Sequence, residues 1–211
     1  MTPTIPYPAL TRRLRAAIRT TTGSTGARWL PVVASLLMVL LLPISGSAAT
    51  DGAFTDGRAA QLDAAQVAKL KALKAPIAVP TFVPDGYALK GVIVQGEKSG
   101  GFWIVEYSLE YRTEAGDSFV VNSANEGIGD AIIESKLEGE NPYFEGVVSV
   151  GPPERDEPVA VEREVGTQWV ESKAANVPRG ARSKKQFYRL SGEGLSQEDA
   201  LKVMLSLRYL K

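Results

Sequence analysis

The chain has 211 residues, 24 of them basic and 24 acidic, and it contains neither cysteine nor histidine. Without these two residue types it cannot form disulfides, Ser-His-Asp or Cys-His nucleophiles, or the usual zinc, copper and haem sites. Residues 1–49 hold five arginines and no acid, which leaves 19 basic and 24 acidic residues elsewhere, so a nucleic-acid partner is not expected.

The N-terminal segment has the order of a secretory signal. Its arginines precede an apolar run over residues 30–44, which is shorter than the roughly 20 residues of a membrane-spanning helix. Small residues follow, and cleavage between Ala49 and Thr50 fits the usual small-residue site. We therefore expect residues 1–49 to be a signal peptide and the mature protein to be periplasmic or secreted. An uncleaved anchor in the inner membrane, and export by the twin-arginine rather than the general route, remain open alternatives.

The mature chain begins with a short lead and a helix. Residues 50–61 are small and polar and are expected to be a flexible lead to one globular domain over residues 62–211. A helix is predicted over residues 63–75, because Asp63 is a favourable N-cap and Gln66 can complete a capping box. The lysines of this helix are expected to face solvent.

The middle of the chain alternates between apolar and polar residues, which is typical of half-buried strands. Strands are predicted over residues 87–97, 103–112, 118–124, 131–137, 145–150, 159–165, 167–171 and 186–190. Glycine-containing turns between the first three predict antiparallel hairpins. A closing helix is predicted over residues 197–208, after the N-cap Ser196. The predicted fold class is α+β, an antiparallel sheet of about five to seven strands with an N-terminal and a C-terminal helix packed on it.

An aromatic row on the second predicted strand is the candidate ligand-binding feature. Trp103, Tyr107 and Tyr111 share one face of that strand and could line a groove or stack on a sugar. Such a row is more often the buried face of a strand, and that interpretation is favoured here. Glu106 and Glu110 lie on the opposite face and are the carboxylates considered for a hydrolase. Four residues along a strand span about 13 Å, which is more than the separation of paired glycosidase carboxylates. Alternating glutamates are also ordinary on any solvent-exposed strand.

Two further groups of charged residues have weaker patterns. Asp117, Glu126 and Asp130 flank glycine-rich loops and could hold calcium, but their spacing is not that of a dedicated calcium loop. A basic run, made of Arg179, Arg182, Lys184 and Lys185, could contact an anionic lipid or polymer. A solvated surface loop explains that run more simply. No glycine motif for a phosphate cofactor appears, so neither a cofactor nor a metal is expected.

The order of these parts resembles a known bacterial family. The stretch from Pro80 to Leu89 (Pro-Thr-Phe-Val-Pro-Asp-Gly-Tyr-Ala-Leu) leads to an aromatic strand, and the segment from Gly194 to Leu201 opens the closing helix. Over roughly residues 70–210 this arrangement resembles the domain of unknown function 4367. That family is similar in outline to the C-terminal domain of the periplasmic sigma-E regulators. The resemblance implies an antiparallel sheet with flanking helices outside the cytoplasm, and it carries no catalytic residues.

The function expected from these observations is binding rather than catalysis. We expect a non-catalytic interaction or sensing module of the bacterial cell envelope, whose partner is a protein or an envelope component. Any membrane contact would come through the signal or an uncleaved anchor, with an anionic surface contact by the basic run as a further hypothesis. A carrier or sensor of an apolar ligand, such as a lipid, would require an enclosed apolar cavity. A carboxylate hydrolase would require two acids facing one cleft, and a structural envelope protein would present a flat apolar patch.

Overall fold

The computed structural model describes residues 51–126, 128–129, 133–154 and 163–211. The predicted signal peptide, with its cleavage site between Ala49 and Thr50, lies outside these residues, as does Asp130 of the hypothetical calcium site. Among the residues that are described, no helix is long and apolar enough to cross a membrane.

Antiparallel sheet dominates this part of the chain. Its larger sheet contains β3 (Ala88–Ser99), β4 (Phe102–Arg112), β5 (Ser118–Ala124), β6 (Leu137–Gly139), β7 (Phe144–Glu145), β8 (Val148–Gly151), β9 (Glu164–Thr167), β10 (Val170–Ser172) and β11 (Phe187–Glu193). Within the described residues these nine strands follow the order β3-β4-β5-β11-β9-β8-β6, with β10 beside β11 and β7 beside β10. A smaller sheet has the order β1-β12-β2, from β1 (Phe54–Thr55), β12 (Leu207–Leu210) and β2 (Ala78–Pro80).

The fold is therefore mainly antiparallel sheet with two α-helices in the described residues, which agrees with the α+β class. The sheets hold more strands than the five to seven that we expected. The additional strands are two to four residues long, too short for alternation to be recognised in a sequence. For the same reason the strand predicted over residues 145–150 appears as β7 and β8.

The long strands follow the predicted hairpins. Gly100 and Gly101 turn the chain between β3 and β4 with φ of 56° and 93°, a backbone region open mainly to glycine. Gly116, with φ of 96°, makes the next turn between β4 and β5. Buried and half-buried residues alternate along both β4 and β5, so one face of this part of the sheet is in the core.

The first helix, α1 (Ala64–Lys71), begins with the expected capping box. The Asp63 carboxylate accepts the Gln66 backbone N–H at 2.7 Å, and the Gln66 side chain accepts the Asp63 backbone N–H at 2.9 Å. The helix is shorter than the predicted range of 63–75. Lys74 has a left-handed φ of 53°, which no α-helix accommodates, and Pro76 follows it.

The second helix, α2 (Gln197–Leu205), starts at Ser196, whose hydroxyl accepts the Asp199 backbone N–H at 3.1 Å. Its predicted extension to residue 208 is wrong, because the chain continues as β12. Leu207 and Tyr209 are buried while the residues after each are half-buried, a period of two that overlaps the end of the helical pattern. Spacing at i+3 and i+4 placed Leu207 on the helix, but pairing with β1 and β2 decides its conformation.

Residues 51–60 also differ from the expected flexible lead. They form η1 (Asp51–Ala53), β1 and η2 (Arg58–Ala60), and β1 pairs in parallel with β12. Ala53 and Ala60 are almost completely buried. Their small side chains, which suggested an irregular segment, instead allow the backbone to pack closely against the body of the domain.

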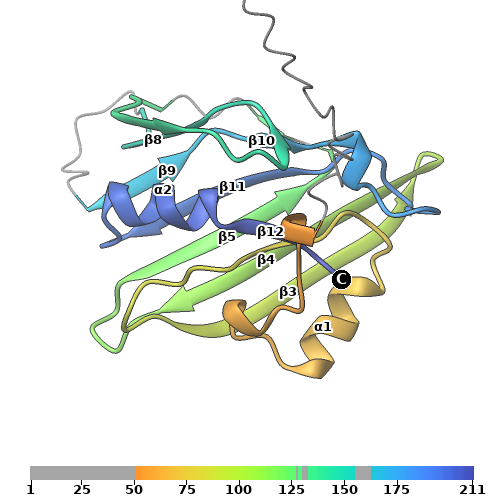
Figure 1. Cartoon of the computed structure of the whole chain (residues 1–211), viewed down its shortest axis with the longest axis horizontal. Coiled ribbons are helices and arrows are strands. Elements are labelled where there is room, and N and C mark those ends of the chain that lie inside the picture. The colour runs from red at the N-terminus through yellow and green to blue at the C-terminus, as the bar shows by residue number, and fades with distance from the viewer. Residues whose placement is uncertain (1–50, 127, 130–132, 155–162) are drawn as a thin grey trace, which may run out of the picture. The chain divides into compact units, whose positions relative to one another are not determined.

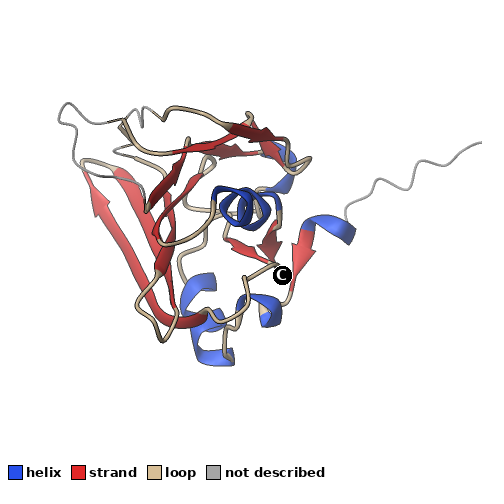
Figure 2. Ribbon diagram, turned by 90° about the vertical axis from the view of Figure 1, so that its left-hand side faces the viewer, coloured by secondary structure: helices blue, strands red, loops and turns tan. Residues whose placement is uncertain are grey.

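Figures 1 and 2 show how these elements enclose the core. Strands lie on more than one side of α2, which is seen end-on in Figure 2. The space between them is filled: Leu190, Val203, Met204 and Leu207 have no exposed surface. The hydrophobic core of the described residues runs from Ala53 to Tyr209.

Candidate functional site

The aromatic row predicted on β4 belongs mostly to the core. Tyr107 and Tyr111 are at most 2 % exposed. The Tyr107 hydroxyl donates to the Ala78 carbonyl at 2.6 Å and accepts the Ala78 N–H at 2.8 Å. The Tyr111 hydroxyl donates to the Ala60 carbonyl at 3.0 Å. Burial raises the pKa of both tyrosines above the ordinary tyrosine value, so neither side chain is open to a ligand.

Trp103, the third member of the row, is half-buried and covered by a cation. The Arg182 guanidinium lies 4.1 Å from the centre of the Trp103 ring, a distance typical of a cation–π contact. The structure therefore separates the row: Tyr107 and Tyr111 belong to the core, whereas Trp103 lines a hollow of about 340 Å³.

The two carboxylates on the other face of β4 are separated from the clefts. Glu106 lies opposite Gln95 and Ala124, while Glu110 lies opposite Gly91 and Val120. Both are half-buried on the outer face of the sheet, and neither lines any of the clefts discussed below.

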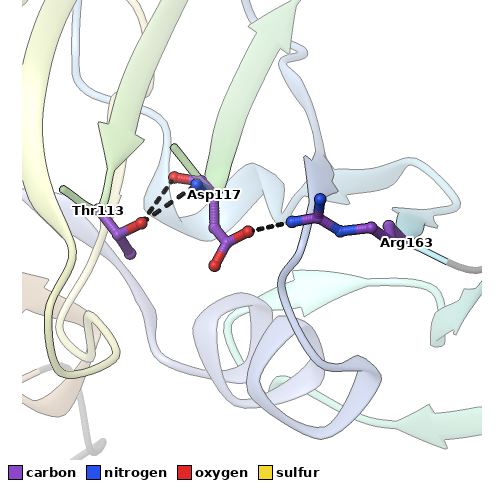
Figure 3. Close-up of polar contacts among 3 residues, drawn as sticks. All are labelled: Thr113, Asp117 and Arg163. Atoms are coloured by element: carbon purple, nitrogen blue, oxygen red, sulfur yellow. Dashed lines mark hydrogen bonds and ion pairs between the residues drawn. The ribbon is translucent and has the colours of Figure 1, made fainter. Parts of the chain in front are cut away.

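The hypothetical calcium ligands do not converge in the described part of the chain, where no group of three or more acidic residues is placed to hold a metal ion. Asp117 instead forms an ion pair with Arg163, and its backbone N–H donates to the Thr113 hydroxyl at 3.1 Å (Figure 3). Gly194 lies so close that a β-carbon there would overlap the Asp117 carboxylate. These contacts tie the β4–β5 turn to the segment before α2.

A cleft of about 510 Å³ lies on the outer face of the sheet, over β5, β9 and β11. Arg189 lines it, with its guanidinium 4.7 Å from the centre of the Trp169 ring. The acids Glu154 and Glu193 line the same cleft. Because both signs of charge are present, the lining does not select a ligand of one charge.

A different cleft, of about 570 Å³, is lined by four basic side chains and by no acidic side chain among the described residues. We call it the basic cleft; its cations are Lys71, Lys74, Arg179 and Lys211, and its apolar floor is Ala75, Ile77, Pro178 and Leu210. Within the described part of the chain none of the four cations forms a salt bridge. Uncompensated cations around an apolar floor favour an anionic ligand with some apolar surface.

Backbone hydrogen bonds hold the three segments of the basic cleft together. The Arg182 N–H donates to the Lys74 carbonyl at 2.6 Å, which fixes the loop carrying Arg179 against the end of α1. At the end of the chain, the Leu210 N–H donates to the Ile77 carbonyl at 2.7 Å and the Lys211 N–H to the Thr55 carbonyl at 2.9 Å. The cations are therefore carried on backbone that is positioned before any ligand arrives.

Comparison of the chain with protein-family models, curated proteins and solved structures found no match. No similar protein therefore indicates which residues form the functional site.

Only one member of the basic run predicted from the sequence lines the basic cleft. Arg179 lines the basic cleft and Arg182 covers Trp103, while Lys185 forms an ion pair with Glu171 at 3.0 Å. Lys184 is exposed. Sequence reasoning missed Lys71, Lys74 and Lys211, because lysines on a helix or at a chain end ordinarily face water. The one indication of Lys71 and Lys74 in the sequence was that lysine recurs along the helix with no acidic residue between the lysines.

Proposed function

We propose that the chain is a non-catalytic interaction module of the bacterial cell envelope, which acts outside the cytoplasm and binds an anionic component through the basic cleft. The observation that carries the proposal is the convergence of four basic side chains from three segments on one apolar floor, with none of the four in a salt bridge within the described residues. Like charges held close together repel one another, and an anionic ligand removes that repulsion. In this proposal α1 serves to place Lys71 and Lys74 at the cleft.

Three further observations support the proposal. The chain has no cysteine and no histidine, so Ser-His-Asp and Cys-His nucleophilic machinery is impossible. The hydroxyls of Tyr107 and Tyr111 are engaged by backbone groups, so they are not available for chemistry. The arginine-rich, apolar and small-residue order of residues 1–49 supports export. Kinship with the domain of unknown function 4367 is part of the same proposal.

The test uses a soluble polyanion and the chain from Thr50 onward. The variant Lys71→Gln, Lys74→Gln, Arg179→Gln is expected to bind inorganic polyphosphate about tenfold more weakly than the parent protein. The slope of log affinity against log salt should fall by about 2, by analogy with counterion release from single-stranded nucleic acid. Titration at several salt concentrations measures both quantities.

A matched variant controls for overall charge. Lys90→Gln, Arg112→Gln, Lys136→Gln removes three cations that are also exposed but lie outside the basic cleft. We expect this control to bind polyphosphate as the parent protein does. Equal losses in the two triple variants would refute the cleft as the binding site.

A further inference from the structure

The hairpin between β3 and β4 carries an exposed aromatic side chain at its tip. Phe102 is 70 % exposed, and it follows directly after the turn formed by Gly100 and Gly101. A single exposed apolar side chain needs no explanation by itself, but an aromatic side chain beside clustered cations is the combination that binding at a membrane interface uses. The residues around Phe102 therefore indicate which kind of partner it contacts.

Arg182 joins this hairpin to the basic cleft. Its guanidinium lies 4.1 Å from the centre of the Trp103 ring, next to Phe102 in the chain, while its backbone N–H donates to the Lys74 carbonyl at 2.6 Å. Figure 1 shows the hairpin tip, the segment of residues 173–185 and the end of the chain on the same side of the domain. Lys184 lines one hollow with Phe102 and another with Pro178, which also lines the basic cleft, so the exposed aromatic side chain and the basic cleft lie on neighbouring parts of the surface.

Further cations surround Phe102 itself. Lys98 is exposed and lies directly opposite Trp103 in the hairpin. Lys184 and Phe102 both line a hollow of about 340 Å³. Among the described residues that line it, Glu126 is the one acid. The surface therefore combines an excess of cations with an apolar side chain at a protruding tip.

We propose that this surface docks on an anionic lipid bilayer, with Phe102 inserted at the level of the head groups and the cations facing lipid phosphates. The inference rests on the proposed function and narrows its anionic component to a membrane surface. A soluble polyanion would be held by the cations alone and would leave Phe102 in water. A bilayer surface complements both features, because it offers negative charge beside an apolar layer.

The test measures sedimentation of the chain from Thr50 onward with lipid vesicles. We expect binding to vesicles of phosphatidylglycerol and phosphatidylcholine, loss of binding in molar salt, and no binding to phosphatidylcholine alone. Phe102→Ser should weaken partitioning about tenfold, through the lost burial of one aromatic side chain. The triple variant of the cleft, Lys71→Gln, Lys74→Gln, Arg179→Gln, should weaken it about a hundredfold.

Val147→Ser is the matched control for Phe102→Ser, because Val147 is 42 % exposed on a different turn, between β7 and β8. It should leave partitioning unchanged. Binding to polyphosphate but not to anionic vesicles would overturn the membrane inference and leave the proposed function standing. Failure to bind either probe would overturn both. Unchanged partitioning of Phe102→Ser would also overturn the inference, because the hairpin would then not enter the lipid.

Discussion

At alkaline pH the domain is expected to unfold in one cooperative step between about pH 11 and 12, driven by its buried tyrosines. Tyr107, Tyr111, Tyr188 and Tyr209 are each at most 2 % exposed. Burial raises the pKa of all four above the ordinary tyrosine value of about 10. Their hydroxyls are also held by hydrogen bonds to backbone carbonyls, such as the bond from Tyr188 to Pro76 at 2.8 Å.

The direction of the effect follows from which state holds the protons. Above about pH 10 the unfolded chain loses its tyrosine protons while the folded chain keeps them. The contribution of these groups is therefore complete below pH 10 and is lost as the pH rises toward the folded-state pKa. Each tyrosine removes about 1.4 kcal/mol of stability per pH unit in this window. Four together remove roughly 5 kcal/mol per unit, which is comparable with the whole stability of an ordinary domain.

Circular dichroism and tyrosinate absorbance, followed together during alkaline titration, measure this coupling. We expect most of the absorbance change to coincide with the loss of secondary structure. In the variant Tyr188→Phe the dependence of unfolding free energy on pH should be shallower by about a quarter. Ionisation of all the tyrosines at their ordinary pKa, with secondary structure intact, would contradict the burial described here.

The substitution Gly194→Ala is expected to destabilise the domain by about 3 kcal/mol or more, through two combined effects. Gly194 has a φ of 78°, in the left-handed region where a β-carbon costs about 1 to 2 kcal/mol. The added carbon would also overlap the Asp117 carboxylate and disturb its ion pair with Arg163. Asp117 has a short side chain that is anchored at the start of β5, so it has little freedom to move away.

Gly86→Ala separates the two effects, because Gly86 has a similar φ of 84° but no atom within 4 Å of the added carbon. Denaturant unfolding of the chain from Thr50 onward should show a loss of only about 1 kcal/mol for this control. Adding Asp117→Ala to Gly194→Ala should recover part of the larger loss, since the overlapping carboxylate is then gone. Equal losses at Gly194 and Gly86 would show that the close approach to Asp117 has no energetic consequence.

Elements set by neighbouring residues were predictable from the sequence. The capping box of Asp63 and Gln66 depends on contacts three residues apart, and it is present in the structure. The predicted strand over residues 118–124 coincides with β5, because alternation continues through its whole length. Local chemistry suffices where one hydrogen bond or one face of a strand decides the conformation.

Features set by distant contacts were not predictable. The pattern around Leu207 satisfied both a helix and a strand, and only pairing with β1 and β2 selects the strand. The basic cleft brings Lys74 and Arg179 together, although they lie 105 positions apart in the sequence. A backbone hydrogen bond between Arg182 and Lys74 creates that proximity, and no periodicity or motif in the sequence indicates it.

The central claim, that the basic cleft is where this protein holds its anionic ligand, is tested most directly by an NMR titration with short-chain polyphosphate. Amide shifts of the chain from Thr50 onward would locate contact residue by residue. We predict the largest changes over residues 71–75, 179–185 and 210–211, and no change over the outer face of the sheet around Arg189. Changes centred on Arg189, with the amides of the basic cleft unmoved, would contradict the claim.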